Sequence, residues 1–346
     1  MEITSAPKIA VTIVTYNSDR YIRRCLESIF KQDHAPEQVI VVDNASRDET
    51  PVILREFENL IRVVYNHENI GFAAGQNQAI ALSQADWILT LNADVCLTPS
   101  FITRILEAGE ADSSAGSVCG KLLAAPPDFE IPQTPIIDST GIYFTPNLRH
   151  FDRGSKTSDQ GQYERFEYVF GATGAAALYR REMIQDISVF GEFFDSDFFA
   201  YREDAELAWR AQLLGWKCLY TPLAVAYHVR NVLPSNRRSL PAIIKMHSVK
   251  NRFLLRIKNT TGNVYFSNFL AITLRDLTVI GACLLYEWRS LRAFSFILRN
   301  WKRTWAKRDE IMRRRRAGDA YMSAWFSVHP VSYPAAERSS KCALLC

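Results

Sequence analysis

The first hundred residues alternate between two spacings of apolar side chains. Short apolar runs rich in β-branched residues predict strands, and the segments between them read as helices. We expect strands at residues 8–15, 38–43, 62–65 and 87–91, and helices at residues 19–32, 46–58 and 75–83. The second helix opens with Ser46 and Glu49 at the spacing of a capping box. Strands that alternate with helices pair in parallel, so the pattern predicts an α/β fold with helices on both faces of the sheet.

Polar side chains end three of these apolar runs. In 86-DWILTLNADVCL-97, for example, a buried-type strand stops at an amide and a carboxylate before apolar residues resume. The polar residues in question are Thr15 and Asn17, Asp43 and Asn44, and Asn92 and Asp94. Parallel sheets of this class bind ligands beyond the carboxyl ends of their strands. The pattern therefore predicts one ligand-binding edge, although Asn and Asp also suit turns and helix caps, which is the structural alternative.

The segment 69-NIGFAAGQNQAI-80 places two glycines before a predicted helix. Backbone N–H groups at a helix start can face an anion or a sugar hydroxyl, which makes Gly71, Gly75 and Asn77 candidate ligand contacts. The segment matches neither a Walker A nor a GxGxxG sequence, so those nucleotide-binding folds are not supported. The alternative is that the glycines only serve a tight turn.

A second group of acidic residues lies between residues 191 and 216. The sequence 195-DSD-197 is a literal DxD, but it does not follow a buried strand of the first half, so we do not interpret it as a metal motif. The segment 202–216 reads as a helix that stops at Gly215. Glu203 and Asp204 lie near the start of this helix, where its dipole favours anions.

Composition indicates an ordinary globular protein with an uneven distribution of charge. The chain has 346 residues, of which 48% are hydrophobic and 23% charged. Residues 1–236 contain 20 Lys and Arg against 31 Asp and Glu, whereas residues 237–316 contain 19 against 4. This contrast suggests two roles for the two parts. The seven cysteines lack CxxC spacing, which argues against a zinc site or a disulfide framework and fits a reducing cytoplasm.

The basic part reads as amphipathic helices. Arg275, Asp276, Glu287 and Arg289 interrupt its apolar stretches, so no run reaches the length that a membrane-spanning helix needs. Aromatic residues alternate with arginines instead, which suits an anionic membrane surface. A helical subdomain packed on the first part, or an oligomer contact, is the alternative. No nucleic-acid module accompanies the basic residues, so we do not expect nucleic acid as a partner.

Several segments together resemble family 2 glycosyltransferases, and in particular their rhamnosyltransferase-like branch. The resemblance covers residues 8 to about 260, in the order expected for the family. The segments that carry it are VTIVTYNSDRYIRRCLESI, VIVVDNASRDET, NIGFAAGQNQAI, WILTLNADV, FFAYREDAELAWRAQLLGW and AYH. The resemblance implies a GT-A fold, which is Rossmann-like, for residues 1–236, with residues 237–346 as a basic helical extension.

The resemblance assigns roles at the predicted edge. A carboxylate at Asp43 can accept the N3–H of uracil or thymine, as the matching aspartate does in the family. The other residues implied on the donor side are Thr15, Asn17, Asn44, Gly71, Gly75, Asn77 and Asn92. Asp94 aligns with the main ligand of a divalent cation, Mg²⁺ or Mn²⁺, and His228 can complete that site. Asn92 departs from the acidic form that is common in the family, which could weaken the binding of the metal.

The remaining assignments concern the acceptor. An inverting transferase needs one base to take the proton of the attacking hydroxyl, and the family places it at Asp204. The candidates on the acceptor or diphosphate side are Asp195, Glu203, Lys250 and Arg252. The resemblance implies transfer of a sugar, by analogy rhamnose from a dTDP donor, to a glycan or a polyprenyl-diphosphate-linked acceptor at the cytoplasmic face of the membrane. A UDP-sugar donor, or an inactive sugar-binding scaffold, are the alternatives.

Overall fold

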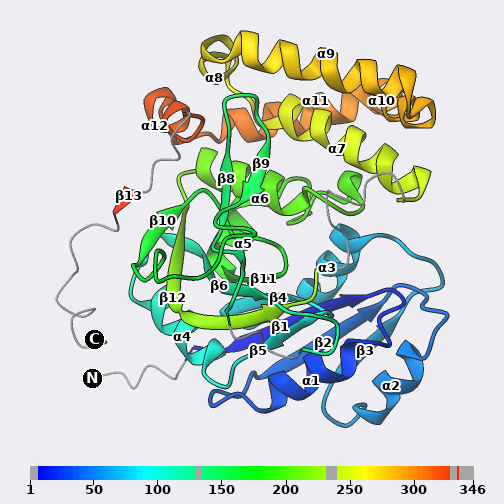
Figure 1. Ribbon diagram of the computed structural model, residues 1–346, viewed down its shortest axis with the longest axis vertical. Coiled ribbons are helices and arrows are strands. Elements are labelled where there is room, and N and C mark those ends of the chain that lie inside the picture. Colours follow the sequence, from blue (N-terminus) through cyan, green and yellow to red (C-terminus); the bar gives the residue numbers. More distant parts are fainter. Residues whose placement is uncertain (1–6, 130–133, 231–239, 328–332, 335–346) are drawn as a thin grey trace.

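The computed structural model describes residues 7–129, 134–230, 240–327 and 333–334 (Figure 1). Its centre is one mixed sheet of 11 strands in the order β13-β10-β12-β6-β11-β4-β1-β2-β3, with β5 paired to β12 and β7 to β6. These strands are β1 (Ile9–Thr15), β2 (Gln38–Asp43), β3 (Arg62–Tyr65), β4 (Trp87–Asn92), β5 (Val95–Leu97), β6 (Ala115–Ala124), β7 (Ile137–Ser139), β10 (Glu167–Val169), β11 (Ala176–Arg180), β12 (Lys217–His228) and β13 (Tyr333–Pro334). The α/β fold predicted from the sequence is confirmed.

The four strands predicted from the sequence form one parallel part of the sheet, and β6 and β12 form another. β1 pairs in parallel with β2 and β4, and β2 pairs in parallel with β3. Apolar residues of β1 point alternately to the two faces: Ala10 belongs to one core, and Val11 and Ile13 belong to the other. β11 then pairs antiparallel with β4, which makes the complete sheet mixed.

Helices cover both faces of the sheet. α1 (Ile22–Phe30), α2 (Thr50–Glu56) and α4 (Phe101–Glu110) contribute apolar residues to the core on one face. α3 (Phe72–Ala81), α5 (Arg181–Ile187) and α6 (Glu203–Leu213) contribute to the core on the other face. This second core extends to the hairpin of β8 (Ile142–Phe144) and β9 (His150–Asp152), which stands apart from the sheet and reaches the C-terminal helices (Figure 1).

The prediction of a capping box at the start of the second helix was wrong. α2 begins at Thr50, its N-cap residue Glu49 makes no capping hydrogen bond, and the N–H of Thr50 donates to Oδ1 of Asp48 (3.0 Å). Ser46 instead donates from its hydroxyl to Oδ1 of Asp43 (2.5 Å) and from its backbone N–H to Oδ2 (3.1 Å). The carboxylate at the end of β2 thus takes both donors of Ser46, and the helix starts one turn later.

The basic part of the chain forms a helical layer over α6 and the β8–β9 hairpin (Figure 1). Its helices are α7 (Ala242–Asn259), α8 (Gly262–Ser267), α9 (Phe269–Leu285), α10 (Arg292–Arg299), α11 (Trp301–Arg313) and α12 (Asp319–Ala324), with a 3₁₀ turn at Trp288–Leu291. Phe326, which follows α12, packs on Phe144 and on Trp209 of α6. The helical layer and the sheet therefore share one hydrophobic core.

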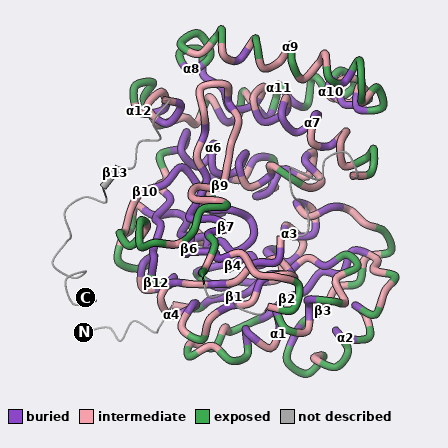
Figure 2. Tube along the Cα trace, in the orientation of Figure 1, coloured by how far each residue is buried: buried purple, intermediate pink, exposed green. Residues whose placement is uncertain are grey.

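Much of the outermost helix is exposed (Figure 2). On α9, Leu270, Leu274 and Leu277 keep 74%, 66% and 62% of their surface accessible. Within the described ranges, no helix combines the length and apolarity needed to cross a bilayer.

Candidate functional site

The predicted polar residues meet along one edge of the parallel sheet. Thr15 lies beside Asp43 in the β1–β2 register, and Asn92 lies beside Val14 in the β1–β4 register. Asp43 is only 2% exposed. Its Oδ1 accepts hydrogen bonds from the hydroxyls of Thr15 (2.9 Å) and Ser46. These bonds fix the orientation of the carboxylate.

A tight loop beside Asp43 is held by two hydrogen bonds, each between a backbone N–H and a side-chain oxygen. Asn17 has a positive φ of 51°, its N–H donates to Oγ of Ser46 (2.9 Å), and its Oδ1 accepts from the N–H of Arg47 (2.9 Å). The side chain of Asn17 therefore closes the loop that follows β1 onto the loop that follows β2.

The glycine segment has tight packing as well as proximity to the edge. Gly71 has a φ of 90°, and a Cβ there would lie 2.6 Å from Phe199. A Cβ on Gly75 would lie 3.0 Å from Val14 of β1. The carbonyl of Gly71 accepts a hydrogen bond from Nδ2 of Asn44 (3.0 Å), which ties the segment to the end of β2. Both glycines thus have the turn and packing role that was the alternative interpretation, while their predicted ligand contact stays a prediction.

Asn77 is engaged elsewhere in the fold. Its Nδ2 donates to the carbonyl of Phe194 (2.7 Å), and its Oδ1 accepts from the N–H of Phe194 (2.9 Å). Both ends of the amide therefore bind the backbone of the segment before α6. This geometry gives Asn77 a bracing role between α3 and that segment.

Asp94 and His228 converge from two different strands. Asp94 follows β4, whereas His228 ends β12, which pairs antiparallel with β5 so that His228 lies opposite Val95. Nε2 of His228 lies 3.4 Å from Oδ1 of Asp94. On the other side of the ring, Nδ1 lies 2.8 Å from Oδ2 of Asp138. The imidazole thus sits between two carboxylates.

These contacts determine the charge state of His228. Burial disfavours the imidazolium, but the hydrogen bonds and charges of Asp138 and Asp94 outweigh it and raise the pKa of His228 to about 9. When Nδ1–H donates to Asp138, a neutral ring would turn its Nε2 lone pair toward Asp94. Two such donors side by side fit a divalent cation that displaces the proton.

The donor set fits a cation that is completed by its substrate. Among the described residues, no group of three or more His, Cys, Asp or Glu side chains is placed to hold a metal ion. A Mg²⁺-type or Mn²⁺-type ion is commonly held by one or two protein ligands together with water and substrate phosphates, and Asp94 and His228 fit that pattern. Asn92 is half-buried at the end of β4, close to the same edge.

We did not predict from the sequence the residues that orient His228. Asp138 of β7 also accepts from Nη2 of Arg230 (3.1 Å), whose Nη1 donates to Asp152 of β9 (2.7 Å). Arg230 and His228 share Asp138, so the loop after β12 is tied to the β8–β9 hairpin. The only sequence signal was a lone aspartate in 137-IDSTG-141, which is 90 residues away from His228.

Glu203 and Asp204 differ in the hydrogen bonds that their carboxylates accept. Asp204 accepts from the backbone N–H groups of Gly174 (3.0 Å) and Ala205 (2.7 Å), although burial still raises its pKa. Among the described residues, Oε2 of Glu203 has no hydrogen-bond partner. Burial, and then the charge of Asp204, raise the pKa of Glu203 to about 8. The carboxylate of Asp204 thus has two backbone donors for its charged form, whereas Oε2 of Glu203 has none among the described residues.

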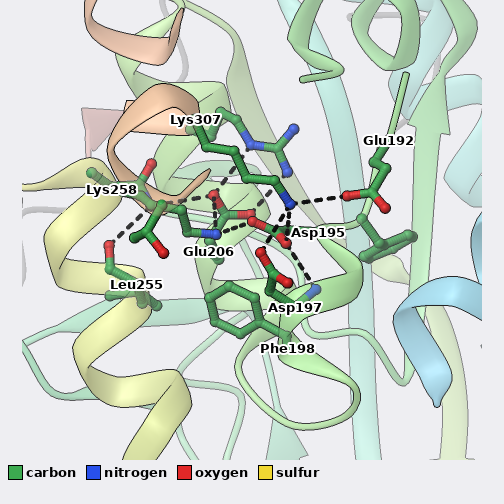
Figure 3. A network of polar contacts seen from close by, with 12 residues as sticks. Glu192, Asp195, Asp197, Phe198, Glu206, Leu255, Lys258 and Lys307 are labelled. Atoms are coloured by element: carbon green, nitrogen blue, oxygen red, sulfur yellow. Dashed lines mark hydrogen bonds and ion pairs between the residues drawn. The ribbon is translucent and has the colours of Figure 1, made fainter. Parts of the chain in front are cut away.

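Asp195 lies in a buried ionic network (Figure 3). It forms an ion pair with Lys258 of α7, and its Oδ1 accepts from Nζ of Lys307 of α11 (2.8 Å). Lys258 also approaches Glu206 of α6 (3.7 Å). Two lysines of the helical layer thus neutralise carboxylates of the sheet domain, which gives Asp195 a structural role in the fold.

The two predicted basic residues of α7 have different surroundings. Lys250 is buried, donates to the carbonyl of Asp197 (2.5 Å) and lies 4.5 Å from the centre of the Phe296 ring. Burial lowers the pKa of Lys250 to about 8. Arg252 is 5% exposed, and its Nη1 is buried without a hydrogen-bond partner among the described residues.

A family model described as "Glycosyl transferase family 2" matches residues 10–188, which is more than half of the chain. The chain belongs to glycosyl transferase family 2. The match contains β1 to β4, the edge residues and Asp138, whereas His228 and Asp204 lie beyond it.

Similar proteins include two rhamnosyltransferases. The N-acetylglucosaminyl-diphospho-decaprenol L-rhamnosyltransferase of Mycobacterium tuberculosis is 28% identical over 241 residues, which cover 64% of this chain and 75% of that protein. The O-antigen chain rhamnosyltransferase RfbN of Salmonella typhimurium is 27% identical over 234 residues, which cover 66% and 68%. The first of these names describes an acceptor with a diphosphate.

Solved structures of glycosyltransferases share the fold. GalNAc-T7 with UDP, GalNAc and Mn²⁺ superposes with a TM-score of 0.60 at 12% identity, covering 78% of this chain and 52% of that one. The mannosyltransferase PcManGT from Pyrobaculum calidifontis with GDP-Man and Mn²⁺ has a TM-score of 0.51 at 18% identity, covering 93% and 88%. The GT-A fold expected from the sequence is therefore confirmed.

Proposed function

We propose that this family 2 enzyme is an inverting rhamnosyltransferase. It transfers rhamnose from dTDP-rhamnose to a hydroxyl of a glycan on a lipid-linked acceptor. The observation that carries the proposal is the convergence of Asp94 and His228, with Nε2 and Oδ1 3.4 Å apart, on the sheet edge that also holds Asp43. The similarity to two rhamnosyltransferases supports the choice of donor sugar.

Asp94 and His228 would hold a Mg²⁺ or Mn²⁺ ion, with Asp138 orienting the imidazole. Bound there, such an ion would neutralise the negative charge of the departing nucleoside diphosphate. Asp43 would accept the N3–H of the thymine ring, because Thr15 and Ser46 hold its carboxylate in a fixed orientation at the sheet edge.

Asp204 would accept the proton of the attacking hydroxyl. Two backbone N–H groups orient its carboxylate, and burial raises its pKa, which brings the group closer to the operating pH of a general base. Glu203 beside it would stay protonated below pH 8 and so would not compete for this role.

Donor hydrolysis across a panel of dTDP- and UDP-sugars tests the proposal, with Mg²⁺, Mn²⁺ or EDTA. We expect metal-dependent turnover of dTDP-rhamnose, and at least a hundredfold loss in Asp94→Ala and in Asp204→Asn with folding intact. Product stereochemistry, followed by NMR with an acceptor present, tests inversion.

Other outcomes identify the alternatives. Preferential turnover of a UDP-sugar would keep the fold and the chemistry but discard the rhamnosyl donor. Absence of any nucleotide binding, with or without metal, would favour an inactive sugar-binding scaffold, which is the function that Asn92 keeps open.

We also propose that the enzyme works at a membrane surface on the cytoplasmic side. The exposed leucines of α9 and the excess of basic residues in the helical layer support this placement. A lipid-linked acceptor would then meet the sheet edge without leaving the bilayer.

A further inference from the structure

Arginines from four separate elements gather between the sheet domain and the helical layer. They are Arg149 in the turn of the β8–β9 hairpin, Arg202 immediately before α6, Arg252 of α7 and Arg275 of α9, and we call them the arginine cluster. The charges of Arg202 and Arg275 act on Arg252, and that of Arg275 acts on Arg149. Arginines that lie as far apart in the sequence as residues 149 and 275 thus act on one another through their charges.

Two arginines of the cluster have buried N–H donors without an acceptor among the described residues. Nη1 of Arg252 and Nε of Arg275 are buried, and neither has a hydrogen-bond partner among the described residues. Burial and the neighbouring guanidinium groups lower the pKa of Arg252 to about 9. A buried cation with an unmet donor is unfavourable unless an anion pairs with it.

The nearby carboxylates are used by other arginines. Asp276, next to Arg275, forms an ion pair with Arg256, whose Nη2 lies 2.8 Å from its Oδ2. Asp152 of β9 forms an ion pair with Arg230. Asp276 still acts on Arg252 through its charge, so its negative charge is shared between Arg256 and Arg252, and Asp152 is engaged by Arg230.

His150 supplies no negative charge to the cluster. Nδ1 of His150 lies 3.1 Å from Nη1 of Arg202. Burial, and then the charges of Arg202, Arg252 and Arg149, hold the pKa of His150 well below its usual range. The ring is therefore neutral and accepts a hydrogen bond from Arg202. It adds a polar side chain beside the cluster without adding charge of either sign.

The surroundings of the cluster indicate the kind of anion. Arg202 directly precedes Glu203 and Asp204, so one side of the cluster adjoins the proposed base. Arg256, one helical turn from Arg252, lines an open pocket of about 440 Å³ between α7, α8 and α11. The apolar and aromatic lining of this pocket comprises Phe253, Ile257, Tyr265 and Trp305.

We propose that the arginine cluster binds the diphosphate of a prenyl-diphosphate-linked acceptor, with the first prenyl units in the pocket beside Arg256. Guanidinium groups bind phosphate oxygens through strong charge-assisted hydrogen bonds. The proposed cation site lies at Asp94 and His228, on the sheet edge, and would serve the donor's diphosphate. This inference rests on the proposed function, and it assigns a separate site to the second substrate.

The binding of farnesyl diphosphate to the full-length protein in EDTA tests this assignment, measured by calorimetry. The comparison probe is dTDP with Mn²⁺, because a diphosphate could also come from the donor. In Arg252→Gln and Arg149→Gln we expect the affinity for farnesyl diphosphate to fall at least about tenfold relative to the affinity for dTDP. Arg292→Gln is the control, because Arg292 is exposed on α10, and it should bind farnesyl diphosphate as the wild type does.

Thermal unfolding without ligand separates binding from a structural role. Loss of an uncompensated buried cation should leave the Tm of Arg252→Gln equal to or above that of the wild type, whereas loss of a structural contact would lower it. Arg149 is less buried than Arg252, so Arg149→Gln keeps the test available if Arg252→Gln fails to fold.

Two results would overturn the inference: unchanged binding of farnesyl diphosphate in both variants, or an equal loss of affinity for dTDP with Mn²⁺. The second result would assign the cluster to the donor. Metal-dependent turnover of dTDP-rhamnose by the wild type is measured independently, so a failure of the proposed function is distinguishable from a failure of this inference.

Discussion

His228 shows how a single residue is prepared for a role that its sequence position suggests only weakly. Its ring is fixed by Asp138, which is 2.8 Å from Nδ1, and Asp138 is fixed by Arg230. A carboxylate behind a metal-binding histidine holds the ring in one tautomer and orientation. The position of Nε2 toward Asp94 is therefore set by Asp138 and Arg230.

The first prediction concerns this support. Asp138→Asn should weaken Mn²⁺ affinity and reduce donor turnover by about 10- to 100-fold, because the amide orients the ring less firmly. Titration of activity with Mn²⁺ checks it, and excess metal should restore part of the rate. The control is Asp309→Asn, because Asp309 is exposed on α11. A wild-type titration curve in Asp138→Asn would contradict the proposed role.

The second prediction concerns the pH dependence of stability. The pKa of Glu203 is about 8 in the folded state, above its ordinary value of 4.5, so between these values the folded protein binds more protons than the unfolded chain. Stability should therefore fall as pH rises from 4.5 through 8. Each unit of pKa shift corresponds to about 1.4 kcal/mol.

Glu203→Gln should remove this contribution, because its side chain cannot ionise. Urea unfolding at pH 6 and pH 9 measures it, and we expect the variant to lose at least about 1 kcal/mol less than the wild type between the two values. An identical loss in the two proteins would show that Glu203 is already ionised at pH 6.

At the scale of elements, apolar patterning predicted the strands better than the helix starts. The runs at 38–43 and 62–65 became β2 and β3 without change, because β-branched residues buried on a sheet leave few alternatives. The start of α2 was misplaced because the carboxylate of Asp43, held in place by the sheet, competes for Ser46. Local sequence contains no information about that competition.

The candidate site was predictable to the same extent. Asp94 and His228 stood out because each follows or ends a strand within a recognisable motif. Asp138 did not, and Arg252 was the only predicted member of the arginine cluster, since the partners of these residues come from elements tens of residues away. Asp195 was expected near the acceptor, and its position in the ionic network depends on two lysines in the helical layer.

The third prediction concerns the attachment of α11. Nζ of Lys307 lies within 3.1 Å of oxygens of Glu192, Asp195 and Asp197, and its side chain is 7% exposed. Lys307→Met would leave these three carboxylates without the cation that they share, and only Lys258 on Asp195 and Arg303 on Asp197 would remain. Unfolding free energy should fall by about 3–5 kcal/mol, the cost of breaking a buried ion pair from one side.

The control for this experiment is Lys302→Met on the same helix, because Lys302 is exposed. Its unfolding free energy in urea should stay within about 0.5 kcal/mol of the wild type. Equal stability of the two variants would show that Lys258 alone neutralises Asp195.

At the scale of the whole molecule, one face combines apolar and basic residues. The leucines of α9 are exposed, and so are Trp288 and Trp301 (66% and 46%), while basic side chains dominate the composition of the same layer. Amphipathic surfaces of this kind bind anionic membranes through apolar burial together with charge.

The fourth prediction follows from that face. The full-length protein should float with vesicles that contain anionic lipid, and less so at high salt because counter-ions screen the basic residues. Leu270→Glu combined with Leu274→Glu should abolish most of this binding, at a loss of about 1.5–3 kcal/mol per leucine. The control is Leu60→Glu, because Leu60 is 58% exposed in the loop between α2 and β3. Equal flotation of both variants would remove α9 from the binding surface.

The shared core around Phe144, Trp209 and Phe326 has a consequence for protein engineering. The change of charge near residue 236 suggests a convenient cloning boundary. A fragment ending there would expose this aromatic cluster, and it would leave Asp195 without Lys258 and Lys307. Chimeras that exchange the helical layer between relatives will therefore need matched partners on α6 and the hairpin. The full chain is thus the segment to exchange.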